Sequence, residues 1–149
     1  MPADSFTFCL NTSTIRGQKL GIIGEIDVAV AAGYTAIEPW LDTLNEYVKT
    51  GGSVDDLAKR IRDSGLQIPS AIGFAQWIVD DPATRKAGLE QAKRDMALVA
   101  RIGGTRIAAP PAGAQDKHMS DLLTIADRYR ALLDIGLKEG VIPQVEVWG

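Results

Sequence analysis

The chain has 149 residues, of which 46% are hydrophobic and 23% charged, a balance typical of a globular domain with one sizeable core. Its formal net charge of −3 offers no basic surface for a polyanion, so nucleic acid is not an expected partner. The sequence has no basic leader and no apolar run near the ~20 residues of a membrane helix, so we expect a single cytoplasmic domain over residues 1–149 with no membrane contact.

The first predicted strand covers residues 5–10 and contains the single cysteine, Cys9, in an apolar run. A lone cysteine has no internal disulfide partner, and we expect this one to be a small buried residue of the core. Asn11 follows at the end of the strand. Its amide predicts either a contact with a substrate hydroxyl or a turn. A first helix is marked less clearly, by isoleucines and a valine between residues 22 and 30.

A junction between helix and strand recurs four times along the chain. In each case a glycine ends a helical stretch just before a short apolar run, and these glycines are Gly33, Gly65, Gly103 and Gly140. Each suits the left-handed position that closes a helix. Their spacings of 32, 38 and 37 residues fit one strand and one crossover helix per repeat. The pattern therefore predicts an array of βα units.

Three of the helices carry their own start signals. Ser53, with Asp56 three residues later, resembles a capping box. Asp81 precedes Pro82, a pair that predicts an N-cap followed by proline at the first helical position. Ser120 is the predicted cap of the last helix. Because the apolar residues after each cap share one helical face, these helices are expected to cover the outside of a sheet.

Alternating strands and helices predict a parallel sheet with right-handed crossovers, either open and doubly wound or closed into a barrel. The first strand continues into Asn11-Thr-Ser-Thr-Ile-Arg-Gly17 and not into the Gly-x-Gly-x-x-Gly of dinucleotide-binding sheets. Strand parity places Asn11, Glu38 and Glu146 on inward-facing strand tips, as in a barrel. We therefore predict an α/β fold of the (β/α)8 TIM-barrel type, present as the first four βα units plus a fifth strand near 142–148.

Glu146 is a charged residue in the fifth strand, which is otherwise predicted to be buried. Burying a carboxylate is costly unless a cation or hydrogen bonds compensate. An internal ion pair with an arginine would provide this compensation, and so would a bound metal. We favour the second interpretation, in which Glu146 is a metal ligand that also exchanges a proton with the substrate.

Other polar and aromatic side chains are predicted near the strand ends. Glu38 is expected to hydrogen-bond a substrate hydroxyl or to orient a neighbour, with a rim ion pair as the alternative. Trp40, Trp77 and Trp148 all lie at or just beyond strands, where indoles either wall a sugar pocket or pack against the core. His118, the only histidine, lies in the loop after the fourth strand, a position compatible with a site role or with solvent exposure.

Four segments of the chain, residues 9–15, 33–40, 103–110 and 143–149, resemble the xylose isomerase-like TIM-barrel superfamily, in particular its sugar phosphate isomerase/epimerase group. In that family a divalent metal at the top of the barrel is held by two glutamates, an aspartate and a histidine. The resemblance implies that Glu146 is the first of these ligands. It also implies that the other three belong to the sixth, seventh and eighth strands, which lie outside this sequence.

The activity implied by the resemblance is isomerisation or epimerisation of a sugar or sugar phosphate through an enediolate, with Glu146 as metal ligand and acid/base. Oxygen-rich ligands suit Mn, Mg or Co, and Zn is also compatible. One alternative is an inosose dehydratase-like lyase of the same superfamily, and another is a sugar-binding protein without catalysis. A third is a catalytically inert half-barrel that forms a homo-oligomer or awaits a second half, because its first and fifth strands would be open edges. The DNA-binding endonuclease branch is disfavoured by the acidic charge balance.

Overall fold

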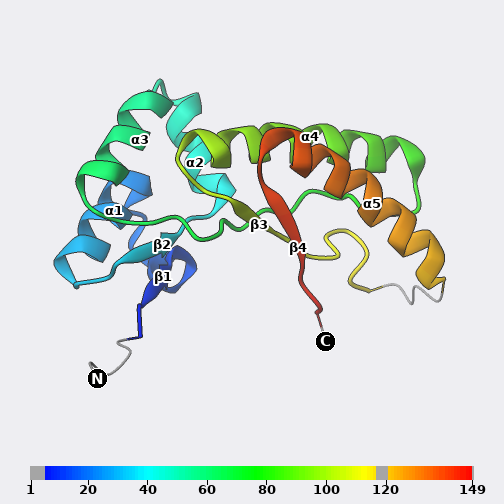
Figure 1. The fold of residues 1–149 in the computed structure, drawn as a ribbon, viewed down its shortest axis with the longest axis horizontal. Coiled ribbons are helices and arrows are strands. Elements are labelled where there is room, and N and C mark those ends of the chain that lie inside the picture. Colours follow the sequence, from blue (N-terminus) through cyan, green and yellow to red (C-terminus); the bar gives the residue numbers. More distant parts are fainter. Residues whose placement is uncertain (1–5, 117–120, 149) are drawn as a thin grey trace.

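The structure is a computed structural model that describes residues 6–116 and 121–148. Strands and helices alternate along these residues (Figure 1). The strands are β1 (Cys9–Asn11), β2 (Ala36–Glu38), β3 (Arg106–Ala109) and β4 (Ile142–Val145). The helices are the 3-10 helix η1 (Thr12–Gln18) and the α-helices α1 (Gly21–Ala31), α2 (Leu41–Lys49), α3 (Val54–Asp63), α4 (Pro82–Arg101) and α5 (Leu122–Glu139). No helix in the described ranges is long and apolar enough to cross a membrane.

The strands run parallel and form one series through an irregular segment, residues 67–72. Strand β1 pairs with β2, and β3 pairs with β4. Single parallel bridges join the two pairs through the segment, and these are Ala36 with Gln67, Trp40 with Ile72, and Ile72 with Ala108. Pro69 lies inside this segment and has no backbone N–H to donate, which explains why the third position is bridged at its ends only. The order β1, β2, 67–72, β3, β4 matches the five predicted strand positions.

The predicted helix boundaries are largely confirmed. All four junction glycines adopt positive φ angles, between 74° and 92°. Ser53 Oγ accepts a hydrogen bond from the Asp56 N–H at 3.2 Å, and the Asp81 carboxylate accepts one from the Thr84 N–H at 2.7 Å. The cap of α5 was predicted wrongly. Asp121 is the N-cap, since its carboxylate accepts from two backbone N–H groups of the first turn, and Ser120 lies outside the described residues.

Two helices were not predicted, and two strands are shorter than expected. Helix α2 and the 3-10 helix η1 both follow strand ends directly. Strand β1 covers Cys9–Asn11 where residues 5–10 were expected, and β4 ends at Val145 where the prediction extended to 148. The predicted burial of Cys9 is also wrong, because its side chain is exposed. Strand parity gives the reason: Leu10 takes the helix-covered side of β1 and is 7% exposed, so its neighbour Cys9 takes the other.

The core lies between the strands and the helices. Its fully buried members include Ile37, Leu57, Val99 and Val141. Helices α4 and α5 lie side by side, and α5 packs on β4 (Figure 1). The contact is closest at Gly136 of α5, where an added β-carbon would lie 2.3 Å from the carbonyl oxygen of Val141. Glycine at this position is therefore what allows the helix to approach the strand.

The buried carboxylate of helix α4 should make stability depend on pH. Asp95 of α4 is 3% exposed and accepts hydrogen bonds from Asn45 Nδ2 at 3.3 Å and Gln91 Nε2 at 3.4 Å. Burial raises the pKa of Asp95, and the two hydrogen bonds oppose that shift. The folded state therefore binds the proton of the Asp95 carboxyl group more tightly than the unfolded state does. The protonated Asp95 carboxyl group contributes to stability at low pH, and this contribution is lost as the pH rises through the raised pKa.

We therefore expect the Asp95→Asn variant to lose less stability than the wild type between about pH 4 and about pH 7. Urea unfolding at the two pH values measures the difference. Asp134→Asn, which changes an exposed carboxylate of α5, is the control and should leave the pH dependence as it is in the wild type. An unchanged pH dependence in Asp95→Asn would contradict the burial of this carboxyl.

Candidate functional site

Three of the predicted site residues come together where β1 and β2 end. Asn11 closes β1, Glu38 closes β2 directly opposite it in the register, and Trp40 follows two residues later. Asn11 Nδ2 donates a hydrogen bond to Glu38 Oε2 at 2.8 Å, and Trp40 Nε1 donates to Asn11 Oδ1 at 3.1 Å. These three side chains form a continuous chain of hydrogen bonds, which we call the strand-end network.

Asn11 serves the turn and the network at once. It is the N-cap of η1, and its Oδ1 also accepts a hydrogen bond from the Ser13 N–H at 3.0 Å. Because Oδ1 receives two donors while Nδ2 donates to a carboxylate, the hydrogen bonds determine the orientation of the amide. The turn role predicted for Asn11 is therefore confirmed, and its contact with a substrate hydroxyl stays a prediction.

Glu38 is oriented by an amide and not by a cation. The side chain is half-buried, and its hydrogen-bond donor is Asn11. Among residues 6–116 and 121–148, no arginine or lysine forms an ion pair with it, so the rim ion pair considered for Glu38 is not observed. The Glu38 charge also acts on Cys9: partial desolvation of the exposed Cys9 thiol and the nearby Glu38 carboxylate both raise the pKa of that thiol. A raised pKa keeps this thiol protonated, so Cys9 is not an activated nucleophile.

An aromatic row extends from the strand-end network across the ends of the series. The ring centroids of Trp40 and Phe74 are 5.0 Å apart, and those of Phe74 and Trp148 are 6.3 Å apart. The guanidinium carbon of Arg16, in η1, lies 4.8 Å from the centroid of the Trp40 ring. The row therefore places apolar ring faces next to a carboxylate and an amide, a combination suited to a polyhydroxylated ligand.

Glu146 lies one residue beyond the end of β4, and its side chain is exposed. Its N–H donates to the carbonyl oxygen of Ala109 at 3.4 Å, which keeps this segment beside β3. The prediction of a buried strand carboxylate is wrong for this chain. Within the described residues β4 pairs on one side only, with β3, so the strand is an edge and its end is open to solvent.

The described residues do not form a complete metal site. No group of three or more His, Cys, Asp or Glu side chains that could hold a metal occurs in residues 6–116 and 121–148. Glu146 has the oxygen chemistry of one ligand, but a single carboxylate does not hold a catalytic metal. Of the remaining predicted residues, His118 lies outside the described ranges.

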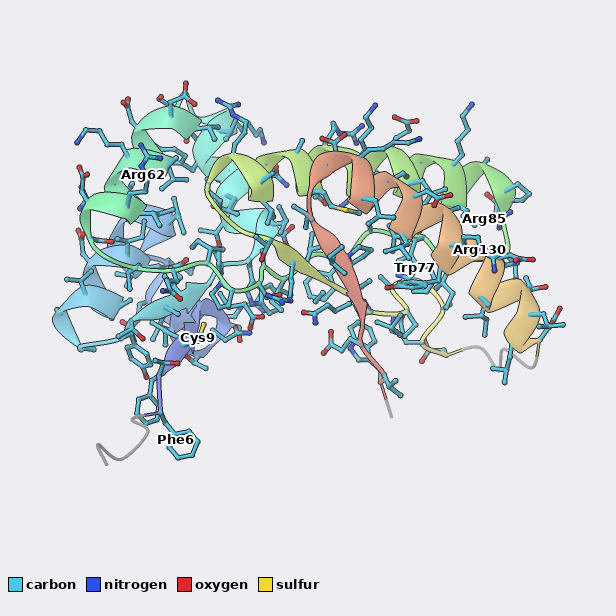
Figure 2. All side chains as sticks on the ribbon, viewed as in Figure 1. Phe6, Cys9, Arg62, Trp77, Arg85 and Arg130 are labelled. Carbon is cyan, nitrogen blue, oxygen red and sulfur yellow. The ribbon has the colours of Figure 1, made fainter. Side chains whose placement is uncertain are left out.

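Trp77 is a core residue and does not join the strand-end network. It is 2% exposed, its Nε1 donates to the Pro110 carbonyl oxygen at 2.9 Å, and its ring packs edge-on against Tyr129 with centroids 5.9 Å apart. Figure 2 shows Trp77 beside α5, whereas Cys9 marks the end of the molecule that carries β1. The indole N–H already has a partner, so we assign Trp77 to packing and not to ligand binding.

Sequence reasoning missed two residues of the site, Arg16 and Phe74. Phe74 lies two residues after Ile72, as Trp40 lies two residues after Glu38, so the strand-end rule that selected Trp40 would also have selected it. Arg16 had no such signal. Its position over the Trp40 ring depends on η1, a short helix with no recognisable periodicity.

Comparison with known proteins agrees with this architecture. The family model for xylose isomerase-like TIM barrels matches residues 26–149. Among solved structures, an IolI protein with a bound zinc atom superposes with a TM-score of 0.78 at 20% identity, covering 94% of this chain and 51% of its own. A xylose isomerase domain-containing protein from Salmonella typhimurium LT2 gives 0.80 at 13% identity, covering 100% and 52%. D-psicose 3-epimerase, crystallised with D-fructose, gives 0.68 at 18%, covering 97% and 53%.

These structural likenesses are distant in sequence, and they show the fold. No curated protein sequence matches the chain. The chain spans about half the length of the solved structures that it matches. The family model, however, covers most of the sequence and confirms the resemblance stated above. The chain therefore belongs to the xylose isomerase-like TIM-barrel family.

Proposed function

We propose that this chain forms the first half of the active site of an isomerase or epimerase that acts on a sugar or sugar phosphate. The observation that supports the proposal is the strand-end network beside the aromatic row. Both lie at the carboxyl ends of parallel strands, where barrels of this kind place their sites. The ring faces of the row suit the C–H face of a sugar, and Glu38 and Asn11 suit its hydroxyl groups.

We further propose that Glu146 transfers the proton and contributes one ligand to a divalent metal. The carboxylate is exposed just beyond the carboxyl end of β4, and the strand-end network lies at the carboxyl ends of β1 and β2. A solved structure with the same fold carries a zinc atom, which supports a metal in this family without identifying the ion used here. Because the described residues form no group of three or more side chains that could hold a metal, the remaining ligands would have to come from other residues.

Sugar binding tests the network directly. Asn11→Ala removes the partner of both Glu38 and Trp40, and buried groups left unpaired cost about 1–3 kcal/mol each. We expect this variant to bind D-psicose, D-fructose or their 6-phosphates about tenfold or more weakly in calorimetric titration. Gln18→Ala, an exposed amide at the end of the same 3-10 helix, is the matched control. The proposal fails if the wild type binds none of the four sugars, or if Asn11→Ala binds them as tightly.

Self-association is a second proposal, and it rests on the open edges of the strand series. Strands β1 and β4 each pair on one side within the described residues, and Phe8, Val145 and Val147 beside them are 69%, 54% and 88% exposed. Unpaired edges with apolar side chains favour pairing with another chain. We expect the 149-residue chain to elute as a dimer or larger species in size-exclusion chromatography with light scattering.

A charged residue placed beside the open edge of β4 tests the proposed self-association. Val147→Lys should shift the population toward monomer, because charged residues on edge strands oppose pairing. Val30→Lys changes an exposed valine of α1, away from the edges, and should leave the assembly unchanged. A wild-type monomer that does not bind an apolar dye would contradict the second proposal and leave the sugar-site proposal standing.

A further inference from the structure

A pocket lies between the start of α1 and helix α2. Its volume is about 550 Å³, which is in the range of small-molecule sites. One wall comes from Arg16, Lys19 and the first turns of α1, and the other from one face of α2. None of the three residues of the strand-end network lines it. The pocket is thus distinct from the strand-end network, and Arg16 is the residue that connects the two, because it lines the pocket and lies over the Trp40 ring.

Glu25 gives this pocket an unmet need for a hydrogen-bond donor. The side chain lines the pocket, is only 5% exposed, and has its Oε2 buried without a hydrogen-bond partner among the described residues. Burial raises the pKa of Glu25, and the nearby Thr12 hydroxyl opposes that shift. A positively charged donor placed in the pocket would relieve the cost of burying the carboxylate.

The charges around the pocket are divided. Asp42 and Glu46, on α2, are the other two acidic groups that line it. Arg16 and Lys19 contribute two cations, next to the N-terminus of α1. The N-cap of α1 is Leu20, which makes no side-chain capping hydrogen bond. No side chain of the N-cap therefore competes with a carboxylate or a similar anion for the first N–H groups of α1, and the helix dipole favours an anion there.

We propose that this pocket binds a free amino acid, with the ammonium group at Glu25 and the carboxylate at the N-terminus of α1 beside Lys19. Leu20, Ile22 and Ile23 also line the pocket, so an apolar side chain such as that of leucine fits its walls. Arg16 belongs to the pocket and to the face of Trp40 at once, so occupation of the pocket is expected to reach the environment of the Trp40 indole. The assignment does not rest on the proposed sugar chemistry.

Binding of L-leucine and of its two halves tests the assignment. The probes are L-leucine, 3-methylbutylamine, which lacks the carboxylate, and 4-methylpentanoate, which lacks the ammonium group. We expect leucine to shift backbone amide signals of Leu20, Gly21 and Ile22 and the indole N–H signal of Trp40 in two-dimensional NMR of the whole chain. Each half-probe should bind about tenfold or more weakly, since it lacks one of the two charged groups that form hydrogen bonds with the pocket.

The variants separate binding from folding. Glu25→Gln keeps the shape of the side chain and removes a buried charge, so it should melt no lower than the wild type and yet bind leucine about tenfold or more weakly. Glu90→Gln, an exposed glutamate of α4, is the matched control and should bind as the wild type does. The proposal is overturned by the absence of leucine binding, by equal affinity for 3-methylbutylamine, or by undiminished binding in Glu25→Gln.

Discussion

For the isomerase or epimerase activity proposed above, replacing Glu146 with glutamine is expected to lower kcat by about two to four orders of magnitude, while KM for the sugar changes little. The amide has the size of the carboxylate but does not accept the proton. The position itself is held by the backbone, through the N–H of Glu146 and the carbonyl oxygen of Ala109, and the substitution leaves that contact in place. The loss should therefore fall on the chemical step.

Exchange of the substrate C–H hydrogen for solvent deuterium, followed by NMR, measures the proton transfer without requiring a net change of sugar. Glu139→Gln, at the end of α5, is the control and should exchange at the wild-type rate. Undiminished exchange in Glu146→Gln would remove this residue from the mechanism. It would leave sugar binding by the strand-end network untouched, so the two parts of the proposed function can fail separately.

Truncation of Trp77 should have the largest effect on stability. The Trp77→Ala variant is expected to lose about 3–5 kcal/mol of unfolding free energy, as large aromatic residues in cores do. The indole is 2% exposed, packs against Tyr129 and donates to the Pro110 carbonyl oxygen, so its removal leaves a cavity and an unpaired acceptor. Trp77→Phe should cost less, because the phenyl ring still fills part of the space.

Urea unfolding of the variants at one pH gives the comparison. Trp148→Ala is the matched control, since that indole is 38% exposed and should cost far less to truncate. Similar losses in Trp77→Ala and Trp148→Ala would contradict the assignment of one tryptophan to the core and the other to the aromatic row.

The parts of the fold that follow from local chemistry were predictable. Gly33 and Gly65 follow α1 and α3 with positive φ, and Ser53 and Asp81 cap α3 and α4, because glycine conformation and side-chain capping act within a few residues. Helix α2 was missed since it has only nine residues and begins after Trp40 without a side-chain cap. Its stability comes from packing against α1, a contact that sequence periodicity does not reveal.

The part of the candidate site that follows from the position of strand ends was predictable, and the rest was not. Asn11, Glu38 and Trp40 were found because parallel strands bring their carboxyl ends to one edge. Trp77 followed the same rule and is buried instead, because it lies five positions after the last bridge, at Ile72, and the loop has room to turn back into the core. The exposure of Glu146 depends on what pairs with β4 across its open edge, which a pattern along one strand does not contain.

The close approach at Gly136 limits how this sequence can diverge. A methyl group there meets the Val141 carbonyl oxygen and Pro143 Cδ, so any other residue must push α5 away from β4. Strand β4 leads directly to Glu146, so a changed contact between α5 and β4 reaches that residue. A harmful natural variant can therefore arise at the face of α5 that packs on the strand, with every site residue unchanged. A second substitution that reseats α5 would restore activity, so the tolerance of position 136 should depend on the genetic background in which it changes.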